Sequence, residues 1–325
     1  MTPLERALRD RIKAEGPITV EAFMEACNSY YYATRDPLGV GGDFTTSPEI
    51  SQMFGELVGA ALADCWKRAG APEEAIYAEL GPGRGTLAAD ALRLMRSVGF
   101  RGETHFVETS AVLRGLQEKA VQDGHWHGSV DDLPARPLLL VANEFLDALP
   151  VRQHVGGIER QVIMAAGGLA FDRDGEIVET SPARDEAVRS IATCISVKGG
   201  VALFIDYGHG RSGPGDTLQA VHLHGFAPVL SKPGEQDLTA HVDFEAVAQA
   251  AQDASATVTP VVNQGEWLIR LGIEARAQAL VRANPDRTEE IQAALDRLTL
   301  QGQMGTLFKV IAIHSADWPA PTGFE

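Results

Sequence analysis

The sequence predicts an α/β fold in which helices flank a mostly parallel sheet. A short apolar strand that begins at residue 75 runs through Glu79 into a loop with three glycines and then into a helical pattern. Continuous apolar runs at 138–142 and 201–205 are typical of strands that are buried on both faces. Because ligands of such sheets bind beyond the carboxyl ends of the strands, we expect the functional residues to follow these segments.

The glycine loop after the first strand is the most informative stretch of the chain. It places Gly81, Gly83 and Gly85 directly before a helical pattern and Glu79 two positions before the first glycine. Glycine lets the backbone turn sharply and approach a ligand, and the helix that follows offers free N–H groups. Dinucleotide folds use G-x-G-x-x-G, whereas this G-x-G-x-G loop resembles motif I of class I S-adenosylmethionine (SAM) methyltransferases. A ligand-free turn is the alternative, but the ordered strand, loop and helix favour a cofactor site.

Polar side chains also follow the next strands. The strand after the glycine helix ends in Glu108, about where a carboxylate that binds ribose lies in related sheets. The apolar run at 138–142 leads into Asn143, Glu144 and Asp147, which we expect beside the reacting atoms. An ordinary charge at a strand end is the alternative for Glu108, and capping of a helix that begins at Asn143 is the alternative for the other three.

The first 72 residues predict a helical cap with a glycine-rich lid. Two short helices, expected at 3–14 and 19–27, precede a polar stretch at 30–49 that is rich in tyrosine and glycine, and a strong helix follows from about 50 to 69. Such a stretch makes little core, so it either covers a site or is an inert loop. Its place before the glycine strand favours a lid. The lid residues expected near the substrate are Thr46, Ser47 and Glu49, of which the first two can also cap the helix.

Residues 73–325 predict the core, with two insertions. Short segments separated by glycine pairs predict a small β insertion at about 151–175, and helical patterns predict a second insertion at about 263–305, before a last strand. The strand at 201–205 ends in Asp206, a second candidate for the crevice. The segment 210–243 reads as a polar loop that anchors itself through its side chains, and we expect His241 of this segment, like Asp206, on the substrate side of the site.

Histidines and cysteines give no metal site. His222, His224 and His241 lie close in the sequence, but their spacing fits no compact ligand pattern such as HExxH. The three cysteines include no CxxC pair, which excludes a zinc site or disulfide framework evident from sequence and fits a reducing compartment. We therefore expect no metal.

The charge and hydropathy of the chain limit its partners. The 28 Lys and Arg against 44 Asp and Glu give a formal net charge of −16, which would repel a phosphate backbone, so no nucleic-acid substrate is expected. A basic protein segment would suit this surface, although an acidic surface also simply aids solubility. No signal peptide and no apolar run long enough for a transmembrane helix is found. We expect no stable membrane insertion and a bacterial cytoplasmic location.

Four motifs taken together resemble the MidA-like family of bacteria and mitochondria. They cover nearly the whole chain in order, and they are the segments 42–56, 79–86, 143–150 and 237–244. The resemblance implies a Rossmann-like class I methyltransferase fold of seven strands, the last one antiparallel, with SAM as cofactor. Mitochondrial members are assembly factors of respiratory complex I and methylate an arginine of one of its subunits. The resemblance thus implies a protein acceptor such as a complex I subunit. It implies a location in the mitochondrial matrix for this chain if the chain is a mature organellar form.

The resemblance also implies roles at the cofactor. Glu79 and the three glycines would hold the methionine end of SAM, Glu108 would bind the ribose hydroxyls, and Asn143 would be a further cofactor-binding residue. Asp131 or Asp132 would lie at the adenine. These assignments come from the family's fold and not from the composition of the segments.

Glu144 and Asp147 are the expected catalytic pair. Arginine methyltransferases of the same broad fold place acidic substrate-binding residues after the corresponding strand, and carboxylates can orient a guanidinium bidentately. The spacing here differs from the double-glutamate hairpin of those enzymes, so the assignment is a topological analogy. A non-catalytic assembly chaperone and an NAD-dependent oxidoreductase are the alternatives, and the sequence does not specify the acceptor residue or the oligomeric state.

Overall fold

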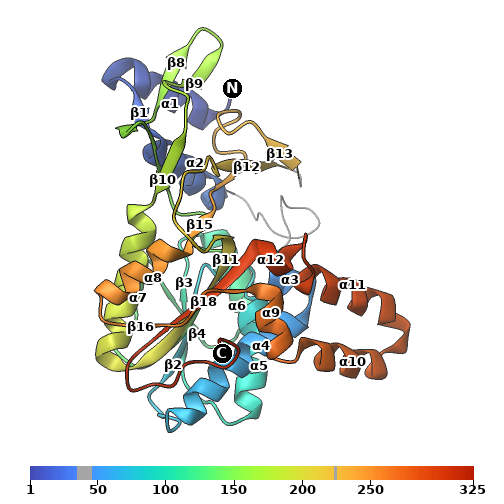
Figure 1. Ribbon diagram of the computed structural model, residues 1–325. Helices are drawn as coiled ribbons and strands as arrows, with labels where there is room; N and C mark the ends of the chain where they lie inside the picture. Colours follow the sequence, from blue (N-terminus) through green and yellow to red (C-terminus); the bar gives the residue numbers. More distant parts are fainter. Residues whose placement is uncertain (35–45, 223–224) are drawn as a thin grey trace.

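A computed structural model describes residues 1–34, 46–222 and 225–325. A central sheet with helices on both faces forms the larger part, and α1, α2 and several short strands form a smaller part above the carboxyl ends of the strands (Figure 1). The glycine-rich centre of the expected lid, 35–45, and His224 lie outside the described residues.

The central sheet is mostly parallel. Its seven-strand path runs β16 (Thr257–Val258), β18 (Phe308–His314), β11 (Gly200–His209), β5 (Leu138–Asn143), β2 (Ile76–Leu80), β3 (Thr104–Val107) and β4 (Gly124–His127). Only β18 runs antiparallel to its neighbours on this path, β11 and β16. The expected α/β sheet with an antiparallel last strand is therefore confirmed. Two short strands join it at the side, β15 (Val242–Asp243) and β17 (Val262–Asn263).

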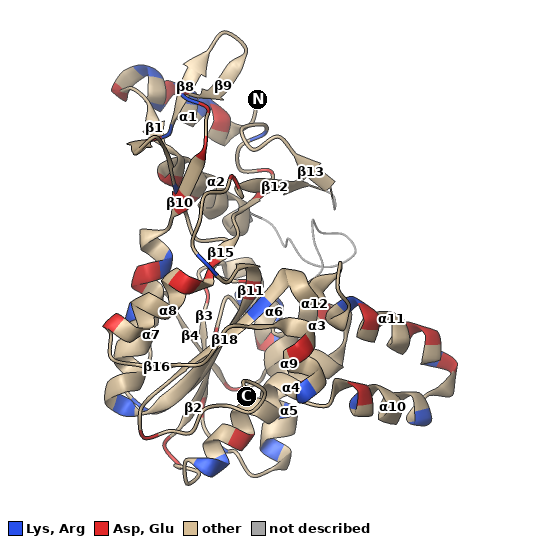
Figure 2. Cartoon of the chain, viewed as in Figure 1, with Lys and Arg blue, Asp and Glu red and all other residues tan. Residues whose placement is uncertain are grey.

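The sheet is buried on both faces, as its apolar strands predict. In β5, Leu139 and Val141 belong to one hydrophobic cluster, whereas Leu138 and Leu140 belong to the cluster on the opposite face. The helices of the first face are α4 (Gln52–Arg68), α5 (Thr86–Ser97) and α9 (Gln264–Arg270), and those of the second are α7 (Pro182–Lys198) and α8 (Phe244–Asp253). Charged residues lie mostly on the outer faces of the helices (Figure 2).

Close helix packing fixes the strand–loop–helix unit that carries the three glycines. Helix α4 lies against α5, and a Cβ on Gly59 would come within 2.6 Å of the carbonyl oxygen of Ala91. Glu56 of α4 accepts hydrogen bonds from Arg93 of α5 at 2.9 Å and from Arg276 at 2.6 and 2.9 Å. These contacts fix α5, the helix that directly follows the glycine loop, against α4.

The N-terminal part consists of two helices and the strands inserted after β5. Helix α1 (Pro3–Glu15) precedes β1 (Ile18–Thr19) and α2 (Val20–Thr34), and the Thr19 hydroxyl accepts the Ala22 N–H at 3.0 Å. The inserted strands form two antiparallel sheets, one of which includes β1. They are β6 (Arg152–Val155), β7 (Ile158–Glu159), β8 (Gln161–Ala165), β9 (Gly168–Phe171) and β10 (Ile177–Thr180).

Two regions differ from the sequence prediction. The polar segment 210–243 is not only loop, because β12 (Gln219–His222), β13 (Gly225–Ala227) and β14 (Asp237–Thr239) form a third small sheet. Strand β16 was not expected, since two residues give no periodic signal. The remaining helical elements are α3 (Ser47–Ile50), α6 (Ala111–Ala120), η1 (Val130–Asp132), α10 (Ile273–Ala283), η2 (Pro285–Arg287), α11 (Thr288–Thr299) and α12 (Met304–Leu307). Helices α10 and α11 project from the side of the sheet (Figure 1).

Candidate functional site

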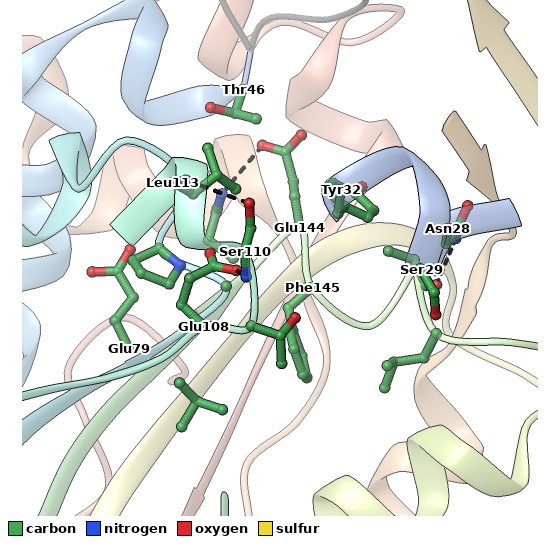
Figure 3. A pocket seen from close by; sticks show the side chains of 18 of the residues that line it. Asn28, Ser29, Tyr32, Thr46, Glu79, Glu108, Ser110, Leu113, Glu144 and Phe145 are labelled. Carbon is green, nitrogen blue, oxygen red and sulfur yellow. Dashed lines mark hydrogen bonds between the residues drawn. The ribbon is translucent and has the colours of Figure 1, made fainter. Parts of the chain in front are cut away.

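A cavity of about 910 Å³ lies at the carboxyl ends of β2, β3 and β5. It is lined by the glycine loop, by the starts of the loops after β3 and β5, by one face of α2 and by the start of α3. Figure 3 shows Glu79, Glu108 and Glu144 in this cavity, with Tyr32 of α2 beyond Glu144. The site therefore forms where the parallel topology predicts it.

The glycine loop has a backbone that other residues would strain. Gly81, Gly83 and Gly85 have φ values of +58°, +54° and +81°. A Cβ on Gly81 would lie 3.1 Å from the Phe145 ring, and one on Gly85 would lie 3.2 Å from the Ala120 Cβ. The glycines thus permit both the left-handed turns and the close packing of the loop against its neighbours.

Glu79 is a buried carboxyl group at the end of β2. Its side chain lines the cavity, the residue is only 3% exposed, and its Oε2 accepts the Tyr77 hydroxyl at 2.7 Å. Burial raises the pKa of Glu79 to about 8, since the single hydrogen bond does not replace the lost hydration. A cationic ligand group in the cavity would favour the ionised form.

Glu108 is held from two sides at the end of β3. Its Oε1 accepts the Ser110 N–H at 2.7 Å and its Oε2 accepts the Gln117 amide at 3.1 Å. Burial raises the pKa of Glu108, against these hydrogen bonds. Gln117 also donates to the Gly83 carbonyl oxygen at 2.8 Å, so one side chain joins Glu108 to the glycine loop. Sequence reasoning did not find Gln117, although a polar residue on the inward face of a helix was the available signal.

The loop after β5 presents Glu144 to the cavity. Its Oε1 accepts the Ser47 N–H at 3.0 Å and the Asn143 amide at 3.2 Å. Glu144 has a φ of +50°, which is unusual for a residue with a side chain. Burial raises the pKa of Glu144 to about 8. Strained backbone of this kind is common at functional sites, and here it fixes one carboxyl group at the end of a central strand.

The expected partner of Glu144 lies elsewhere. Asp147 is buried and does not line the cavity, and its carboxyl group accepts a hydrogen bond from the Tyr207 hydroxyl. Arg184 donates to the backbone carbonyl oxygens of Leu146 and Asp147 at 2.7 and 3.2 Å. The structure therefore does not bring Asp147 together with Glu144 at the cavity wall, because the loop turns the Asp147 side chain into the protein.

Two further predicted residues support the loop instead of lining the cavity. Asp206 is 1% exposed, and its Oδ2 accepts the N–H groups of Leu146 and Asp147 at 3.0 and 3.2 Å. His241 packs its ring edge-on against Tyr207 at 5.6 Å between ring centroids, and burial lowers its pKa. Neither residue contacts the cavity. Both were expected on the substrate side, and this expectation is corrected by their positions.

The residues before α4 reach the site in different ways. Thr46 and Glu49 line the cavity, whereas Ser47 contributes its backbone N–H to Glu144. Glu49 accepts the Thr86 hydroxyl. Thr46 caps α3 by position, without a side-chain hydrogen bond.

Asp131 does not lie in the cavity. Its exposed carboxylate accepts the Ser190 hydroxyl, and the neighbouring wall of the cavity is formed by Ser129 and Val130. Asp132 is also exposed, and its carboxylate accepts the Ser129 N–H at 3.1 Å. The expected place of Asp131 at an adenine ring is therefore not supported by the structure.

One face of α2 forms a wall that sequence reasoning missed. The lining residues of this helix recur at helical spacing and are Glu21, Glu25, Asn28, Ser29, Tyr32 and Ala33. Asn28 donates to the carbonyl oxygens of Ala148 and Leu238 at 2.9 and 2.7 Å, which ties α2 to the loop after β5. The sequence prediction ended this helix at residue 27, before the tyrosines that continue it.

The cavity is acidic. Among residues 1–34, 46–222 and 225–325, its charged lining residues are Glu21, Glu25, Glu49, Glu79, Glu108, Glu144 and Arg84. Six carboxyl groups against one guanidinium favour ligands with positive charge. Among the described residues, no group of three or more possible ligands is placed to hold a metal ion.

A family of S-adenosyl-L-methionine-dependent methyltransferases matches residues 57–168 and 158–262, which include the glycine loop and the strands that form the site. The chain belongs to this family. Its cofactor is therefore SAM, and the glycine spacing is explained without a nicotinamide dinucleotide.

Relatives with curated names are similar over most of their length. The mitochondrial protein arginine methyltransferase NDUFAF7 homolog of Drosophila melanogaster is 34% identical over 95% of this chain and 84% of its own. Mitochondrial NDUFAF7 of Danio rerio is 33% identical over 94% of this chain and 85% of its own. These names agree with the predicted MidA-like resemblance. They give a mitochondrial location for the relatives, so the cytoplasmic location expected for this chain stays a prediction.

Solved structures support the fold and the cofactor. A Burkholderia thailandensis protein bound to S-adenosyl-homocysteine matches with a TM-score of 0.85 and 26% identity, over 98% of this chain and 93% of that one. A native structure from the same organism matches with a TM-score of 0.83 and 27% identity over the same shares. No helix among the described residues is long and apolar enough to cross a bilayer.

Proposed function

We propose that this chain transfers the methyl group of SAM to an arginine side chain of a protein acceptor. The main observation behind the proposal is that one cavity is lined both by the glycine loop, which is the cofactor site, and by several glutamates. The relatives, which are named as protein arginine methyltransferases, support it independently. The resemblance to MidA-like proteins further suggests a subunit of respiratory complex I as the acceptor.

The cofactor roles that we propose follow from the positions of the lining residues. Glu79 and the backbone of the glycine loop hold the methionine end, where the ammonium group of SAM favours the ionised form of the buried carboxyl. Glu108, already oriented by Gln117, accepts the ribose hydroxyls. When bound, SAM supplies a sulfonium methyl group, whose S–C bond breaks as the acceptor N–C bond forms, with the electron pair left on sulfur.

The protein's part in methyl transfer is to orient the acceptor and to suit its charge. A guanidinium is protonated and has five N–H donors and no acceptor, so it requires hydrogen-bond acceptors around it. Glu144 provides one at the end of β5, with its Oε1 already held by Ser47 and Asn143. Orientation of this kind is worth roughly 7–11 kcal/mol in favourable intramolecular reactions. The proton that arginine loses on methylation can pass to the Glu144 carboxylate or to solvent.

We further propose that α1 and α2 act as a cap on the methyltransferase core, to which α4 belongs because it packs on the central sheet. Helix α2 forms one cavity wall and is bonded to the loop after β5 through Asn28. An acceptor would therefore pass along α2 before it reaches Glu144, and Glu25 and Ser29 are exposed on that path.

A Glu144→Gln variant tests the proposed acceptor site. Methyl incorporation from labelled SAM into basic protein acceptors is expected to fall on the order of 100-fold, as when one oriented polar group is removed from an active site. The affinity for S-adenosyl-homocysteine should stay within about twofold. Glu118→Gln, the same change on the exposed face of α6, is the matched control. Unchanged turnover in Glu144→Gln would contradict the proposed role.

A further inference from the structure

The side-chain amide of Asn143 has a fixed orientation at the end of β5. Its Nδ2 donates to Glu144 Oε1 at 3.2 Å, and the opposite orientation would place the amide oxygen against a carboxyl oxygen. The same Oε1 accepts the Ser47 N–H, so both donors hold this carboxyl group from one side. The amide oxygen of Asn143 must therefore point away from Glu144 Oε1.

That oxygen has no hydrogen-bond partner within the described part of the chain. Asn143 lines the cavity, the residue is 8% exposed, and its Oδ1 is buried. Leaving a buried polar atom unpaired costs about 1–3 kcal/mol, and native proteins rarely do so without a ligand or water. An amide oxygen can only accept hydrogen bonds, so the group that pairs with Asn143 Oδ1 must be a hydrogen-bond donor.

The strand register places this acceptor between the two parts of the site. Leu80 pairs with Ala142, so Asn143 lies level with Gly81 of the cofactor loop, and Glu144 comes one residue later. Asn143 is thus next to both the cofactor cradle and the carboxyl group assigned to the acceptor. A donor that bridges Asn143 and Glu144 would lie beside the position where the methyl group is transferred.

We propose that the side-chain carbonyl of Asn143 accepts a hydrogen bond from the acceptor guanidinium that Glu144 binds. This inference rests on the proposed function. The acceptor is then recognised by one amide and one carboxylate, which together carry a single negative charge against the single positive charge of arginine. The pair replaces the second carboxylate that Asp147 does not supply at the cavity.

The test compares Asn143→Ala with Asn143→Asp in the full-length chain saturated with S-adenosyl-homocysteine. The probes are the peptides acetyl-Gly-Arg-Gly-amide and acetyl-Gly-norleucine-Gly-amide, titrated by nuclear magnetic resonance. Asn143→Ala should weaken binding of the arginine peptide roughly 10- to 150-fold, the range for a hydrogen bond to a charged group. Its affinity for S-adenosyl-homocysteine should change by less than about threefold, which also shows that the variant is folded.

Asn143→Asp separates the carbonyl from the amide donor. Aspartate keeps an oxygen at this position but loses the N–H that holds Glu144, so it should recover most of the arginine-peptide affinity that alanine loses. If Asn143 acts only by positioning Glu144 through its N–H, aspartate will be as impaired as alanine, and the inference is wrong. It is also wrong if alanine reduces S-adenosyl-homocysteine affinity as strongly as peptide affinity, because the oxygen then serves the cofactor.

The proposed function can fail separately from this inference. If the wild-type chain binds S-adenosyl-homocysteine but does not prefer the arginine peptide to the norleucine peptide, the arginine acceptor is wrong and the inference fails with it. If the wild-type chain prefers arginine and Asn143→Ala binds it equally well, the function stands and only the role of Asn143 is overturned.

Discussion

Glu79 should make the stability of the free protein fall as the pH rises. Its pKa is raised from 4.5 to about 8 by burial, and the residue is 3% exposed. Between these two values the folded chain keeps a proton that the unfolded chain has lost, so stability is highest below pH 4.5 and decreases until about pH 8. At 1.36 kcal/mol for each tenfold change in proton affinity, the contribution amounts to about 3–5 kcal/mol. Glu79→Gln removes the titrating group and should remove this contribution.

Urea unfolding of the wild type and of Glu79→Gln at several values between pH 5 and 9 measures this effect. Glu144 also has a pKa of about 8 and contributes in the same direction, so the difference between the two proteins is the quantity that matters. We expect the free energy of unfolding of the variant to increase relative to that of the wild type as the pH rises. Parallel pH dependences of the two proteins would refute the assignment of a protonated, buried Glu79.

Other predictions concern the loops around the cavity. Gly85→Ala should lower the free energy of unfolding by about 1–3 kcal/mol and weaken S-adenosyl-homocysteine binding, since φ is +81° and the new Cβ would lie 3.2 Å from Ala120; calorimetry that finds the same affinity would contradict this. Asp206→Ala should destabilise the chain by about 1–3 kcal/mol because it leaves the N–H groups of Leu146 and Asp147 without their acceptor, with thermal unfolding as the readout, and no loss would show that the loop does not need this anchor. Asp131→Asn should leave S-adenosyl-homocysteine affinity within twofold, whereas a tenfold loss would return Asp131 to the cofactor site.

The fold could be predicted because each central strand carries its own signal. Continuous apolar runs such as 138–142 specify strands buried on both faces, and the three glycines specify the turn between β2 and α5. The sheet formed by β12, β13 and β14 could not be predicted in this way, because its short strands are stabilised by contacts with α2 and with each other rather than by a periodic pattern.

The sequence predicted which strand ends form the site, but it did not predict the direction in which each side chain points. Glu79, Glu108 and Glu144 line the cavity, whereas Asp147, three residues after Glu144, points into the protein beside Tyr207. The positive φ of Glu144 and the anchoring by Asp206 decide this direction, and both depend on long-range contacts that spacing does not encode. The wall formed by α2 was missed for the same reason, since its partner loop is distant in the sequence.

Transfer of radioactive methyl groups from SAM, followed by acid hydrolysis and amino-acid analysis, tests the central claim most directly. The wild-type chain is incubated with a protein extract or with a purified subunit of respiratory complex I, and Glu144→Gln serves as the comparison. We expect label in methylarginine with the wild type and on the order of 100-fold less with the variant. Label in another amino acid, or no label from a chain that binds S-adenosyl-homocysteine, would contradict methylation of an arginine at this site.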